Sequence, residues 1–125
     1  MAAKERKDAK ERPLDAPLLS SAIAEQLKQL QSEPQWLSGD RNAITLVKST
    51  RLRIVLVALR KGAMMREHQV EGPITLFVLS GALQFTAGGE KCHLQRQGLM
   101  ALEKTIPHDV EALEDSTFLL TIVQP

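Results

Sequence analysis

Two histidines lie in segments whose residue types suit a binding site. His68 lies between Gly62 and Gly81, and His108 follows Pro107 in the second half of the chain. A neutral imidazole offers one hydrogen-bond donor and one lone pair that accepts a proton or binds a metal ion. In an extended strand Arg66 shares a face with His68, and its guanidinium suits an anionic group of a ligand. The candidate chemistry is therefore recognition of a small molecule, with or without a metal ion.

Short strands must position these side chains. From Asn42 onward the hydrophobic pattern is typical of strands, and turn residues such as Gly72-Pro73, Ser80-Gly81 and Gly88-Gly89 separate the apolar segments. This pattern indicates an all-β sandwich or barrel. The predicted strands cover residues 44–48, 51–60, 64–70, 74–79, 82–86, 91–96, 99–102, 109–112 and 117–122.

The two histidine segments resemble the two motifs of the cupin superfamily. Gly62, His68 and Gly81 match the first glycine, first histidine and last glycine of the first motif, and Pro107-His108 resembles the end of the second. Residues 42–124 are therefore similar to small single-domain cupins. The resemblance implies a double-stranded β-helix (jelly-roll) barrel, to which this chain adds an N-terminal helix. It also implies a homodimer.

The motifs are degenerate at positions that matter for chemistry. Val70 stands where the resemblance implies a second histidine, and Ile74 stands where it implies a glutamate. His68 and His108 are the metal-ligand positions that survive, for a divalent ion such as iron, manganese, nickel or zinc. Two imidazoles alone hold such an ion weakly, because a catalytic zinc typically keeps three protein ligands. The apolar replacements also favour an apolar or neutral ligand.

The predicted ligand pocket combines these histidines with an apolar wall. The sequence alone does not identify a catalytic residue. The pocket residues are His68, His108, Arg66, Met64, Val70, Ile74, Leu76 and Val78.

Three functions are compatible with this pattern. The first is a barrel that binds a small molecule and carries a degenerate two-histidine metal site. The second is a metal-dependent cupin enzyme, of the dioxygenase, isomerase or decarboxylase type, with His68 and His108 on the metal. The third is a structural or regulatory module without catalysis.

Composition excludes several other classes. The chain has 125 residues, enough for one domain. Its formal net charge of +1 and aromatic content of 3% disfavour nucleic-acid binding, which uses basic surfaces and stacking rings. No apolar run approaches the ~20 residues of a membrane helix. Cys92 is the single cysteine, which suits a reducing compartment, and we expect a cytoplasmic protein.

The N-terminal third is predicted to differ from the barrel. Residues 1–14 form a charged tail that we expect to be disordered, because it contains few large apolar groups. Residues 15–41 form a helical arm, with a helix over 18–31 whose apolar stripe is Leu19, Ile23, Leu27 and Leu30. Pro34 ends this helix, and the stripe must cover the barrel or a partner chain. Residues 42–125 form the barrel domain.

Overall fold

The computed structural model describes residues 18–68 and 71–124, with the backbone alone at positions 67 and 68. In this part of the chain two helices precede nine strands. The strands lie where the sequence predicts them. The predicted tail at residues 1–14 lies outside the described residues. The elements are α2 (Ile23–Ser32), α3 (Pro34–Leu37), β1 (Arg41–Lys48), β2 (Leu52–Leu59), β3 (Met64–His68), β4 (Ile74–Ser80), β5 (Ala82–Ala87), β6 (Glu90–Gln95), β7 (Leu99–Leu102), β8 (His108–Ala112) and β9 (Ser116–Val123).

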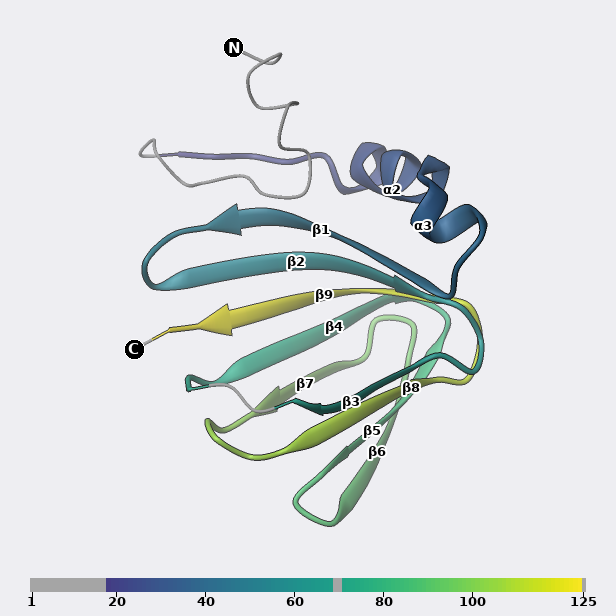
Figure 1. The fold of residues 1–125 in the computed structure, drawn as a ribbon. Helices are drawn as coiled ribbons and strands as arrows, with labels where there is room; N and C mark the ends of the chain where they lie inside the picture. Colours follow the sequence, from purple (N-terminus) through teal and green to yellow (C-terminus); the bar gives the residue numbers. More distant parts are fainter. Residues whose placement is uncertain (1–17, 69–70, 125) are drawn as a thin grey trace.

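The strands form two antiparallel sheets. One sheet has the order β1-β2-β9-β4-β7, and the other has the order β3-β8-β5-β6. Figure 1 shows the two sheets as two layers, with α2 and α3 beside β1 on the outside. Strands distant in sequence are neighbours in both sheets, because β2 pairs with β9 and β3 pairs with β8. This non-sequential strand order is that of a jelly-roll barrel, and it confirms the all-β prediction.

The main core lies between the sheets. On β4 the side chains of Ile74, Leu76 and Val78 alternate toward the interior, and each is at most 3% exposed. On β8 the interior residues are His108, Val110 and Ala112. The interior positions follow the period of two that an antiparallel strand imposes. Full burial of one such aliphatic side chain stabilises the fold by about 1.5–3 kcal/mol.

A second apolar cluster covers the outer face of the larger sheet. Leu30 of α2 and Trp36 of α3 pack with Ile44 of β1 and Leu56 of β2. Leu30, Ile44 and Leu56 are fully buried. The helical stripe therefore covers the barrel of its own chain, which is one of the two placements that the sequence predicts.

Polar contacts fix the helices on this face. Asn42 donates from Nδ2 to the Leu30 carbonyl oxygen at 2.9 Å, which satisfies an acceptor at the carboxyl end of α2. Arg60 donates from Nη2 to the Trp36 carbonyl oxygen at 2.9 Å. Its guanidinium carbon lies 3.8 Å from the centre of the Trp36 ring. The start of β1 and the end of β2 thus anchor both helices.

The helix starts later than predicted. Residues 18–22 are not helical, Leu18 is 83% exposed, and α2 begins at Ile23. Ser20 and Ser21 explain this difference, because serine hydroxyls compete for backbone hydrogen bonds in non-helical conformations. The predicted end is confirmed, because Glu33 is extended before Pro34 (φ −85°, ψ 152°). Within the described residues no helix is long and apolar enough to cross a membrane.

Candidate functional site

A cavity of about 290 Å³ lies between the two sheets. It receives side chains from β2, β4 and β9 of one sheet and from β3, β5 and β8 of the other. Among the described residues, all the lining side chains are apolar except those of Arg53 and His108. The lining residues are Arg53, Val55, Met65, Ile74, Leu76, Phe85, His108, Val110, Phe118, Leu120 and Ile122. The predicted pocket residues His108, Ile74 and Leu76 are therefore brought together here.

Two neighbours hold the His108 ring in one orientation. Its Nδ1 lies 3.0 Å from the Ile106 carbonyl oxygen, and its ring stacks on Phe85 with centres 5.3 Å apart and planes inclined by 22°. A carbonyl oxygen only accepts, so Nδ1 is the protonated nitrogen in this hydrogen bond. In the neutral form of the ring, the lone pair is then on Nε2. His108 is only 8% exposed.

The backbone of His68 lies beside that of His108. The Cα atoms of these two residues are register partners in the β3–β8 pair. Between Met65 and His68 the register shifts, because β3 advances from 65 to 68 while β8 advances from 110 to 108. One extra residue on β3 is a β-bulge, which reverses the alternation of side chains along the strand. Because of this bulge, Met65 lines the cavity wall and Met64 does not.

The other predicted pocket residues have different positions. Arg66 is exposed and Met64 is paired with Glu111, a position outside the barrel interior. Val78 is fully buried in the core, but it is not among the described residues that line the cavity. Val70 lies outside the described residues. The structure therefore places neither Arg66 nor Met64 with His108. The prediction assumed strict alternation along β3, and the bulge between Met65 and His68 interrupts this alternation.

Arg53 is a site residue that sequence reasoning missed. It lies on β2 and pairs with Ile122 of β9, and its side chain lines the cavity. Its Nε is buried and has no hydrogen-bond partner among the described residues. A signal was present in the sequence, because Arg53 has the same parity as Val55 and Val57, which both contribute to the inner core. A charged residue in phase with the inner face of a buried strand indicates a polar group in the cavity.

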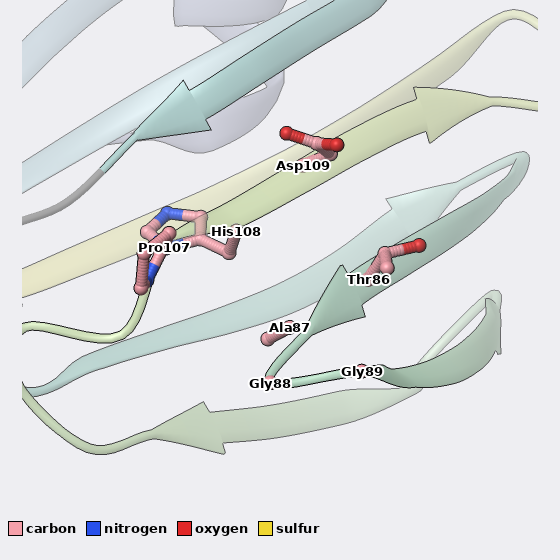
Figure 2. A pocket seen from close by; sticks show the side chains of 7 residues that line it. All are labelled: Thr86, Ala87, Gly88, Gly89, Pro107, His108 and Asp109. Atoms are coloured by element: carbon pink, nitrogen blue, oxygen red, sulfur yellow. The ribbon is translucent and has the colours of Figure 1, made fainter.

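His108 also borders a second, smaller depression of about 150 Å³. Figure 2 shows its lining, in which Pro107 precedes β8, His108 begins this strand, and Gly88 and Gly89 lie in the turn between β5 and β6. The side chains of His108 and Asp109 extend from β8 in different directions. Gly88 and Gly89 form the turn with positive φ angles of 57° and 82°. His108 thus borders both the interior cavity and this depression.

The fold is shared with several solved structures. A cupin superfamily protein from Desulfitobacterium hafniense has a TM-score of 0.67 and 17% identity, over 94% of this chain and 98% of that chain. A cupin 2 conserved barrel domain protein from Leptotrichia buccalis has a TM-score of 0.66 and 25% identity, over 70% of this chain and 42% of that chain. This chain has the cupin fold. The cupin-fold salicylate 1,2-dioxygenase from Pseudoaminobacter salicylatoxidans has a TM-score of 0.64 and 19% identity, over 80% of this chain and 30% of that chain. No protein-family model and no curated protein sequence matches the chain.

The described donor atoms in this cupin barrel do not fit a metal held by three protein ligands. Among the described residues, no three His, Cys, Asp or Glu side chains are grouped closely enough to hold an ion. Ile74 lines the cavity at the position where the resemblance implies a glutamate. Arg53 adds a positive charge to the same cavity, which opposes the binding of a cation.

Proposed function

We propose that this cupin-fold barrel binds a small organic molecule in the interior cavity. The observation that carries the proposal is an apolar cavity between the sheets, on which His108 and Arg53 are the two polar side chains among the described lining residues. Small-molecule sites are typically concave and mostly apolar, with a few placed polar groups and volumes of about 300–1,000 Å³. A cavity of about 290 Å³ suits a ligand of the size of one ring or a short chain.

The apolar walls supply most of the binding free energy in this proposal. A ligand that buries about 150 Å² of apolar surface gains about 4 kcal/mol at ~25 cal/mol/Å². That free energy corresponds to a dissociation constant of about 1 mM. The imidazole of His108 contributes a polar contact of fixed direction, because the Nδ1 hydrogen bond and the Phe85 stack fix the ring. Fragment binding is therefore expected at millimolar concentrations.

Filling the cavity tests this proposal. Leu120 lines the cavity, and Thr121 is the next residue on the same strand, with the opposite parity. We expect Leu120→Trp to abolish binding of benzyl alcohol or benzoate, as measured by protein-observed NMR titration. Thr121→Trp is the matched control and should keep the affinity of the unaltered protein. Binding that persists in a folded Leu120→Trp variant would place the ligand elsewhere.

A metal-dependent cupin enzyme is the second candidate function. The observation that favours it is the register that pairs the backbones of His68 and His108, from which we propose two adjacent imidazoles. Elemental analysis of protein purified without added metal separates the candidates. A near-stoichiometric transition metal that is lost in His108→Ala would favour the enzyme. No bound metal together with fragment binding in the cavity would favour the binding barrel. If the protein binds neither a metal nor a fragment, the structural module becomes the best account.

A further inference from the structure

Arg53 brings a positive charge to the cavity without a described counter-charge. Its side chain lines the cavity, and no Asp or Glu is present among the described lining residues. Its Nε is buried and makes no hydrogen bond to any described residue. Arginine stays protonated at all physiological pH values, so the charge cannot be relieved by loss of a proton. A buried charged donor without a partner destabilises a protein unless another group satisfies it.

Two other arginines of the described chain have carboxylate partners. Arg41 is 2.9 Å from a carboxylate oxygen of Asp40, and Arg60 is 3.4 Å from one of Asp115. Both pairs are exposed enough for water to screen them, whereas the Nε of Arg53 is buried. The described part of the chain thus supplies carboxylates to these two arginines but none to the buried Nε of the arginine in the cavity. The partner of Arg53 is therefore expected to come from a bound molecule.

We propose that the cavity accepts an organic monocarboxylate whose carboxylate pairs with Arg53 and whose apolar body fills the space between the sheets. This proposal rests on the small-molecule binding proposed above. A planar guanidinium matches a carboxylate through two parallel N–H···O hydrogen bonds. Arg53 is the one cationic side chain in the described lining, so it balances a single negative charge. A phosphate dianion would keep an uncompensated charge among apolar side chains, which is unfavourable.

The burial of the lining residues indicates how the proposed ligand is oriented in the cavity. Arg53 is half-buried, near the start of β2, where it pairs with Ile122 near the end of β9. Val110 and Phe118 are at most 4% exposed and form a deeper part of the wall. A carboxylate at Arg53 keeps partial contact with water, while the apolar body reaches the dry interior. This orientation avoids burying the charge more deeply than the guanidinium itself.

The test compares an acid with its neutral analogue in the full-length protein. The probes are benzoate and benzamide, and isothermal titration or NMR titration gives their dissociation constants. Arg53→Met removes the charge and keeps an apolar side chain, and Arg53→Lys keeps the charge without the planar fork. Arg51→Met is the matched control, because Arg51 is exposed and precedes the same strand. Thermal unfolding of each variant confirms that it is folded.

Benzoate should bind the unaltered protein about tenfold or more tightly than benzamide, since hydrogen bonds between charged groups contribute on that scale. Arg53→Met should remove this preference, Arg53→Lys should keep part of it, and Arg51→Met should keep all of it. Equal affinities for the two probes in the unaltered protein overturn the carboxylate proposal while small-molecule binding stands. A preference that survives in Arg53→Met also overturns it. Binding of neither probe overturns both proposals.

Discussion

His108 and Arg53 are the polar side chains on the described cavity wall, and they differ in how the chain satisfies them. The hydrogen bond to the Ile106 carbonyl oxygen and the stack on Phe85 orient the imidazole before any ligand binds. The guanidinium of Arg53 has no such partner for its buried Nε among the described residues. We therefore interpret His108 as a preorganised group and Arg53 as the group that a ligand completes.

Gly81 gives a prediction at the residue scale. It has a positive φ of 88°, and a Cβ built there would lie 2.2 Å from the Ser116 Oγ and 2.4 Å from the Asp115 carbonyl oxygen. Gly81→Ala should therefore lower the free energy of unfolding by about 3 kcal/mol or more, because a strained φ and a steric clash add. Urea unfolding measures this difference.

Gly89 is the matched control for Gly81. Its φ is also positive, at 82°, but a Cβ there would meet no atom within 4 Å. Gly89→Ala should therefore cost only the conformational strain, about 1–2 kcal/mol. Equal losses in the two alanine variants would contradict the close approach of the turn at Gly81 to the start of β9.

The sequence predicted part of the site, residue by residue. His108, Ile74 and Leu76 were predicted as pocket residues, and they line one cavity. Met65 and Arg53 were not predicted. The β3 bulge is set by pairing with β8, and a period of two cannot reveal one inserted residue. Arg53 precedes the apolar part of β2 and has the parity of the inward-facing Val55 and Val57, so the strand pattern contains the information that places it on the cavity wall.

At the scale of elements, hydrophobic alternation and turn residues were sufficient to predict every strand of the described chain. The predicted start of α2 was wrong, because the leucine spacing continues through residues 18–22 although the backbone there is not helical. Side-chain periodicity reports the face that an apolar residue presents, but it does not report whether the backbone hydrogen bonds form. Proline gave the end of the helix correctly, because its effect on the preceding residue is local.

The helical arm gives a prediction at the element scale. Removal of residues 1–41 would expose Ile44, Leu46 and Leu56 on the outer face of the larger sheet, where Leu30 and Trp36 now cover them. The truncated protein should unfold at a lower temperature and be less soluble, because an apolar patch on a sheet favours association. Differential scanning fluorimetry and a solubility assay measure these effects.

A shorter truncation controls for chain length. Residues 1–14 are predicted from composition to be a disordered tail, so their removal should leave the unfolding temperature unchanged. If both truncations behave like the full chain, the helices do not stabilise the barrel. A large effect of the shorter truncation would instead show that the charged tail packs on the folded part.

At the scale of the whole molecule, two sheets close around an apolar interior, and the helices cover one outer face. This arrangement leaves the cavity inside the barrel and separates it from the helical arm. A homodimer and a cytoplasmic location stay predictions from the cupin resemblance and from the single cysteine. Light scattering on the purified protein counts the subunits.

The central claim is that a small organic molecule occupies the interior cavity. Methyl NMR of protein labelled at Ile, Leu and Val tests it directly, because Ile74, Leu76 and Leu120 line the cavity while Leu46 and Leu56 belong to the outer cluster. On titration with benzoate, the account predicts chemical-shift changes at the three inner residues and none at the two outer ones. Changes confined to the outer cluster, or no change at millimolar benzoate, would contradict it.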